Sequence, residues 1–279
     1  MKRILASAAC AVLAACGGGS SSNGNNAALG TTFTYGAPQA ASGTQTAAVQ
    51  DQVETILGVQ ATPSTTNAFN AADFTGLTGT LLGGQAADFP AVESAPVSIA
   101  RAAVAHAGPR FAALAHDVTF QDPNCAVETP TSVTLTNCVI TDTGITVDVS
   151  GSLTVDPTAR TATWSFTASM AVTDLTVNYS FSGHVAVTDT TLQATLLADL
   201  NGTGTANGTT ETIGASESAV VDLTYVSSPT TCVTGGTIEA KFVWTALPSG
   251  VSYPNEAAKL TFTGTGSGCA TTATIATST

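Results

Sequence analysis

ATWSFTASMAV, residues 162–172, and LTVNYSFSGHVAV, residues 175–187, are the two segments that decide the fold of this chain. Apolar residues occupy the even positions of the first segment and the odd positions of the second, with Thr, Ser and Asn between them. A period of two places successive side chains on opposite faces of a β-strand. A short turn near Asp174 then pairs the strands antiparallel, with both apolar sets on one side. We predict that four aromatic side chains share this interior: Trp164, Phe166, Tyr179 and Phe181.

The same alternation recurs along most of the chain after residue 117. Further segments of this kind are 133–139, 145–155, 192–200, 219–225, 238–246 and 260–262. Turn-forming sequences separate them, among them Asp156-Pro157-Thr158, Asn201-Gly202 and Pro248-Ser249-Gly250. Short connections favour antiparallel neighbours. We therefore predict a mainly β fold, an antiparallel meander of about nine or ten strands forming a barrel, a half-barrel or a sandwich.

The chain before residue 117 follows a helical period instead. Residues 47–57 place apolar side chains on one helical face, and residues 96–115 carry a similar stripe that Gly108-Pro109 interrupts. We expect a helix over 47–57 and, over 96–115, two short helices or one kinked helix. The predicted organisation is a helical and loop-rich part over 31–116 that packs on the sheet, followed by a β domain over 117–279.

The N-terminus has the pattern of an export signal. Lys2 and Arg3 precede an apolar run that ends in Leu13-Ala14-Ala15-Cys16. This ending resembles the lipobox of bacterial lipoproteins. The resemblance implies a signal peptide over 1–15 and a lipid attachment site at Cys16, carrying a thioether-linked diacylglycerol and an acyl chain such as palmitate. Cys10 is the competing acceptor, but cleavage there would leave an apolar core of only about half a dozen residues, too short for export.

A Gly-, Ser- and Asn-rich stretch follows Cys16 and has no apolar face to bury. We place a flexible tether over residues 16–30. Two acyl-type chains anchor a protein stably, so the membrane is the first expected partner. Gly17 is not aspartate, so the inner-membrane retention signal of enterobacterial lipoproteins is missing. We therefore expect the outer membrane of a bacterial cell envelope as the location.

Composition excludes one class of partner and supports a folded core. Without Lys2 and Arg3, five basic residues face 19 acidic ones, a formal charge of −14. Nucleic-acid binding needs the opposite sign, so we predict no nucleic-acid partner. Hydrophobic residues make up 43% of the chain and charged residues only 9%, a balance typical of folded proteins rather than disordered ones.

Four cysteines remain after the signal peptide and the lipid site, an even number in a compartment where disulfides persist. Four cysteines allow three pairings. We favour Cys125 with Cys138 and Cys232 with Cys269. A zinc site is the alternative, but no C-x-x-C pair or paired histidine spacing supports it.

Signatures of catalysis are missing from the sequence. It has no G-x-S-x-G elbow, phosphate-binding loop, G-x-G-x-x-G fingerprint or H-E-x-x-H pair. His106, His116 and His184 could combine with Asp117 or Asp189, but their spacing is not that of metal ligands. Acidic residues such as Asp142 and Asp156 stand at turns, where hydrogen bonds to the backbone explain them. We predict no enzyme activity, no cofactor and no metal.

The apolar side of the predicted sheet leaves two hypotheses for function. If that side is a filled core, the domain is structural or binds a protein partner. If a half-barrel leaves a groove there, the domain carries a lipid or another apolar ligand. The residues expected to line such a groove are Trp164, Phe166, Met170, Tyr179, Phe181, Phe242 and Trp244.

Overall fold

A computed structural model describes residues 26–41, 43, 121–129, 131–142, 145–156, 158–172, 175–206, 209–226, 232–264, 268–270 and 272–278. The predicted signal peptide, Cys16 and the helices predicted over 47–57 and 96–115 lie outside these residues.

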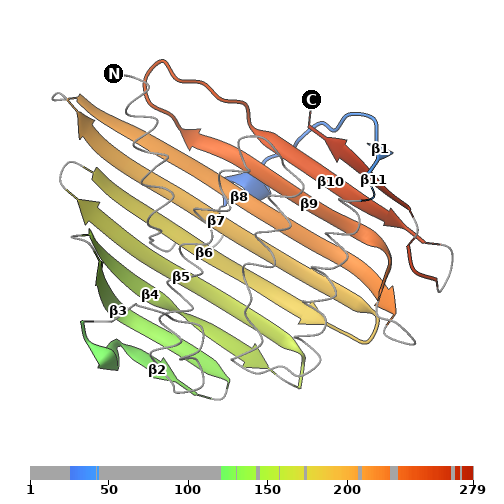
Figure 1. Cartoon of the computed structure of the whole chain (residues 1–279), viewed down its shortest axis with the longest axis horizontal. Helices are drawn as coiled ribbons and strands as arrows, with labels where there is room; N and C mark the ends of the chain where they lie inside the picture. The colour runs from blue at the N-terminus through green and yellow to red at the C-terminus, as the bar shows by residue number, and fades with distance from the viewer. Residues whose placement is uncertain are drawn as a thin grey trace.

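One antiparallel sheet of eleven strands makes up most of the described chain, in the order β1-β11-β10-β9-β8-β7-β6-β5-β4-β3-β2. Figure 1 shows the strands side by side in this order. They are β1 (Gln39–Ala40), β2 (Ala126–Glu128), β3 (Ser132–Asp142), β4 (Ile145–Asp156), β5 (Thr161–Val172), β6 (Leu175–Val187), β7 (Thr191–Ala206), β8 (Thr209–Val226), β9 (Cys232–Ala246), β10 (Glu256–Thr263) and β11 (Thr272–Thr277). From β2 to β11 every strand pairs with its neighbour in sequence, which confirms the predicted meander. The sheet is open, as in the half-barrel and sandwich alternatives, and it is not a closed barrel.

The predicted turn at Asn201-Gly202 is wrong, because β7 continues through both residues. Its register with β8 runs without interruption to Ala206 opposite Thr209. Gly202 lies opposite Ile213, and a Cβ built on this glycine would lie 3.1 Å from the Ile213 Cγ2 methyl. The partner strand therefore supplies both the hydrogen bonds and the packing that keep this pair of turn-forming residues extended.

The predicted shared interior of β5 and β6 is confirmed. Phe166 faces Phe181 across the pair, and Trp164 faces Gly183. The ring centroids of Trp164 and Phe181 are 6.1 Å apart. A Cβ on Gly183 would lie 2.2 Å from Cζ2 of Trp164, so the indole ring occupies the space above the glycine. The absence of a side chain at Gly183 is thus a packing requirement.

The apolar face of the sheet, defined by these residues and those in register with them, is buried from β3 to β10. It includes the largest fully buried side chains of the described chain: Leu153, Leu192, Leu196, Leu200, Leu223, Ile238 and Leu260. Polar residues alternate with them along most strands. In β8 this alternation stops, since residues 214–219 are all buried and both faces are covered there.

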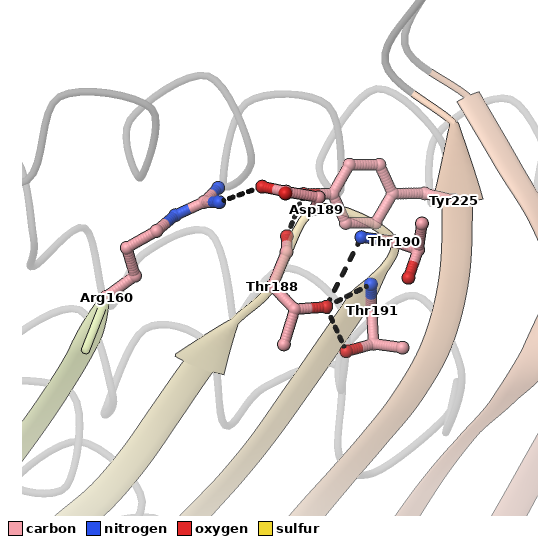
Figure 2. A network of polar contacts seen from close by, with 6 residues as sticks. All are labelled: Arg160, Thr188, Asp189, Thr190, Thr191 and Tyr225. Atoms are coloured by element: carbon pink, nitrogen blue, oxygen red, sulfur yellow. Dashed lines mark hydrogen bonds and ion pairs between the residues drawn. The ribbon is translucent and has the colours of Figure 1, made fainter. Parts of the chain in front are cut away.

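Two hairpin turns at the same end of the sheet share one hydrogen-bond pattern. In the β6–β7 turn, Thr188 Oγ1 accepts from the backbone N–H of Thr190 (3.3 Å) and of Thr191 (2.9 Å), as Figure 2 shows. The β2–β3 turn repeats it, with Thr129 Oγ1 accepting from the backbone N–H groups of Thr131 (3.3 Å) and Ser132 (2.9 Å). A threonine that begins such a turn fixes its shape through its own hydroxyl group.

Further contacts hold the β6–β7 turn against its neighbours. The Tyr225 hydroxyl donates to the Thr188 carbonyl at 2.6 Å. Arg160, at the start of β5, forms an ion pair with Asp189 at 2.7 Å. Three hairpins are thereby joined at one end of the sheet. The Asp189 side chain is almost fully exposed, so this ion pair adds little stability.

Both favoured disulfides are present. Cys125, in the short helix η2 (Pro123–Cys125), bonds to Cys138 in β3, and Cys232 at the start of β9 bonds to Cys269. A bulge between Leu135 and Cys138 shifts the register of β3 on β4. This shift keeps both residues on the buried face and places Cys138 where Cys125 can reach it.

Candidate functional site

The residues predicted to line a groove lie on one face of the sheet but form two separate groups. The first group lies on β5 and β6 and comprises Trp164, Phe166, Tyr179 and Phe181, each at most 6% exposed. Met170 is in register with Val177 at the end of the same strands. Phe242 and Trp244 belong to β9, three strands from β6, and pack together with Ala215 as a distinct cluster. The structure therefore does not bring all seven residues into one site.

The second group combines aromatic rings with carboxyl groups. Phe242 and Trp244 meet edge to face with centroids 5.0 Å apart, and Tyr253 lies against Trp244 at 5.6 Å. Phe242 stands between Glu217 of β8 and Glu256 of β10 in register. Partial burial raises the pKa of Glu256 above its ordinary value of 4.5 through desolvation.

Glu217, like Tyr253 and Glu256, is a residue of this group that our sequence analysis missed. Its side chain belongs to the apolar face, in the row that also contains Ala215, Ala219 and Val221, and the residue is only 2% exposed. The signal was present in the sequence, because an acidic residue occupies a position where the alternation calls for an apolar one. A carboxyl group here costs desolvation free energy and gives this part of the face a polar character.

The opposite face carries a polar cluster beneath residues 26–41, a segment that we call the strap. Asn26 is buried, and its Nδ2 donates to the backbone carbonyls of Ala198 (3.1 Å) and Glu217 (3.0 Å) and to Asp199 Oδ1 (3.1 Å). The Ser216 hydroxyl donates a short hydrogen bond to the same Asp199 oxygen. This cluster explains why β8 is buried on both faces.

The same asparagine begins the helix α2 (Ala27–Gly30). Its Oδ1 accepts from the backbone N–H of Leu29 at 2.9 Å, as a helix N-cap does. The predicted tether over 16–30 is therefore wrong in its last five residues, 26–30, which are packed on β8 and β9. The Asn26 amide has two N–H donors and one carbonyl acceptor, and it uses both ends, to cap α2 and to join the strap to β7 and β8.

Two further contacts hold the strap to β9. Lys241 Nζ donates to the Thr31 carbonyl at 3.1 Å and lies 3.6 Å from a Glu239 carboxylate oxygen. The Tyr35 hydroxyl donates to Glu239 Oε1 at 2.6 Å. Burial and the neighbouring Glu239 carboxylate raise the pKa of Tyr35 above its ordinary range. The strap then reaches the edge of the sheet, where β1 pairs with β11.

The histidines and turn residues do not form a site in the described chain. His106, His116 and Asp117 lie outside it. His184 is exposed on the polar side of β6, and Asp189 is engaged by Arg160. The Asp156 carboxylate accepts from the backbone N–H groups of Thr158 and Ala159, both at 2.9 Å, as turn chemistry predicts. Asp142 ends β3, and its side chain is outside the description.

The described ranges contain no cluster of three or more His, Cys, Asp or Glu side chains suited to a metal ion. Within the same ranges no helix is long and apolar enough to cross a bilayer. No protein-family model, curated protein or solved structure matches this chain. Its function is therefore inferred from its own residues and their geometry.

Proposed function

We propose that this protein is a lipid-anchored lipoprotein of the bacterial outer membrane with a non-catalytic β domain that is structural or binds a protein partner. The observation that carries the proposal is Leu13-Ala14-Ala15-Cys16 at the end of an export signal. Only nine residues, Gly17 to Asn25, separate Cys16 from Asn26, which is packed on the sheet. A lipid on Cys16 would thus lie close to the folded domain.

A filled interior supports the structural role of the first half of the sheet. The Trp164 ring covers Gly183. The Phe166 ring occupies the space above Gly151, because a Cβ built on Gly151 would lie 2.6 Å from Cδ1 of Phe166. Aromatic rings that fill the space above glycines leave no room for a ligand at these positions. The disulfides add rigidity suited to an exported domain.

Replacing the lipid-accepting cysteine tests the anchor. In the native host, Cys16→Ser should move the protein from the membrane fraction to the soluble fraction and abolish labelling by a palmitate analogue. The matched control is Cys10→Ser, which should leave both readouts unchanged. A Cys16→Ser protein that still fractionates with membranes and takes up the label would refute the lipid attachment site.

An apolar-ligand carrier is the second candidate, and the aromatic group on β9 favours it. The Trp244 indole N–H is buried and has no hydrogen-bond acceptor in the described part of the chain. Together with Glu217 and the Phe242 ring it offers a donor, a carboxyl group and apolar surface in one place. A ligand with an apolar body and a polar end fits this chemistry.

Native mass spectrometry distinguishes the two candidates. The Cys16→Ser protein is purified from the periplasm and its mass compared with that of a Phe242→Ala variant. A filled domain gives the mass of the chain alone in both cases. A carrier gives a second mass peak from retained ligand, and Phe242→Ala should reduce the intensity of that peak. The control, Thr167→Ala on the opposite face, should retain it.

A further inference from the structure

Charge is distributed unevenly across the sheet. Residues 121–226 contain eleven acidic residues and a single basic one, Arg160, whereas residues 232–278 contain two glutamates and the two lysines Lys241 and Lys259. The strap, residues 26–41, contains no charged residue at all. The side formed by the strap and β9–β11 is therefore neutral in a chain that is otherwise strongly acidic.

Both lysines lie on the face that the strap covers. Lys241 donates to the Thr31 carbonyl of the strap, and Lys259 is in register with Glu239, which binds Tyr35. Leu29, on α2, is 41% exposed and is one of the few large apolar side chains of the described chain that reach the surface. In Figure 1 the strap lies beside β8–β11, at the opposite side of the sheet from β2 and β3.

The length of the segment between Cys16 and Asn26 limits how far the strap can lie from a membrane that holds the Cys16 lipid. Ten peptide steps join Cys16 to Asn26. Fully extended they span at most about 35 Å. Six strand spacings separate β8 from β2, roughly 29 Å at about 4.8 Å per spacing. The β2 edge is thus much farther from the point of attachment than the strap is.

We infer that the strap and the β9–β11 side of the sheet lie against the phospholipid headgroups of the leaflet that holds the Cys16 lipid, while the acidic β2–β4 edge points away. The inference rests on the proposed lipid anchor. Anionic lipids repel carboxylates near the surface, an effect that fades within a Debye length. A neutral side with an exposed leucine approaches such a surface without that repulsion, and an acidic edge does not.

Fluorescence quenching by headgroup spin-labelled lipids tests this orientation. The full lipidated protein is reconstituted into phosphatidylethanolamine and phosphatidylglycerol vesicles, with a fluorophore on Leu29→Cys or, as the matched control, on Val127→Cys. Both native side chains are exposed, Val127 at 59% on β2. Intact mass and thermal unfolding verify one free thiol and a native fold. Thr32→Cys, exposed on the same strap, replaces Leu29→Cys if that variant is destabilised.

The expected result is quenching several-fold stronger at Leu29 than at Val127. The orientation would be overturned if protein that floats with the vesicles showed equal quenching at the two positions, or stronger quenching at Val127. The anchor would remain supported in that case. Failure of the unlabelled wild-type protein to float with vesicles would overturn the anchor itself and this inference with it. The two failures are therefore distinguishable.

Discussion

Adding one methyl group at Gly183 is the sharpest test of the packing on the apolar face. The new Cβ of Gly183→Ala would lie 2.2 Å from Cζ2 and 2.5 Å from Cε2 of Trp164, and 2.8 Å from the backbone oxygen of Thr195. Ordinary contact begins at 3.4 Å, so the indole ring has to move by about 1.2 Å. Trp164 is only 2% exposed and packs against Phe181, so the ring has little free space.

The expected loss of stability follows from two opposing effects. Overpacking a filled interior costs about 1–3 kcal/mol. Replacing glycine by alanine returns about 0.4–1 kcal/mol, because the unfolded chain loses conformational freedom. We expect Gly183→Ala to lower the free energy of unfolding by roughly 1–2 kcal/mol. The control is Gly235→Ala, whose Cβ would lie 3.3 Å from the Thr224 hydroxyl oxygen, and its effect should stay between zero and a gain of about 1 kcal/mol.

Urea unfolding of the mature chain carrying Cys16→Ser measures both changes without interference from lipid. A second pair of variants isolates the ring as the cause. In a Trp164→Phe background, which removes the two clashing indole atoms, Gly183→Ala should cost less than half as much. Equal effects of Gly183→Ala and Gly235→Ala, or a cost unaffected by Trp164→Phe, would show that the ring does not fill the space above the glycine.

Three further perturbations have defined outcomes. Replacing Cys232 and Cys269 together by alanine should lower the free energy of unfolding by about 4 kcal/mol, since the disulfide closes a separation of 37 residues; a change in denaturant midpoint too small to resolve would contradict this. Asn26→Ala removes an N-cap and three donor contacts, so amide hydrogen exchange in the strap should accelerate, while Asn26→Ser, which keeps an acceptor for the cap, should show a smaller effect. Burial raises the pKa of Glu256 above 4.5, so the folded state binds this proton more tightly than the unfolded state does, and stability falls as the pH rises from 4.5 through the raised value. Glu256→Gln should flatten that decline in a series of unfolding curves, and an unchanged slope would argue against it.

The sheet was largely predictable because its central strands bury one face only, except where the strap also covers residues 214–219 of β8. That condition imposes a period of two on β3 to β10, and the alternation around Trp164 and Phe181 is strong enough to give the pairing as well. The outer strands β1, β2 and β11 were missed because they are short, between two and six residues. Short strands offer too few positions for a period to emerge.

The strap shows why part of the candidate site could not be predicted. Residues 26–41 are mostly small and uncharged, and nothing in their pattern indicates packing. Asn26 acquires its role from contacts 172 to 191 residues away in sequence. Glu217 was recognisable as an exception to the alternation, whereas the close approach of Phe242 and Trp244 to it depends on the register of β8 on β9.

The attachment of the strap also determines how the domain would respond to mechanical load. A pull transmitted from the membrane reaches the fold at Asn26, in the middle of the sheet, rather than at a free edge strand. The contacts of Asn26, Thr31 and Tyr35 would then break one after another before β1 is peeled from β11. Thirteen peptide steps join Asn26 to Gln39, so a segment with a fully extended length of roughly 45 Å is released first. With the proposed lipid on Cys16, the strap would act as a force-absorbing spacer, and the eleven-stranded sheet would be loaded last.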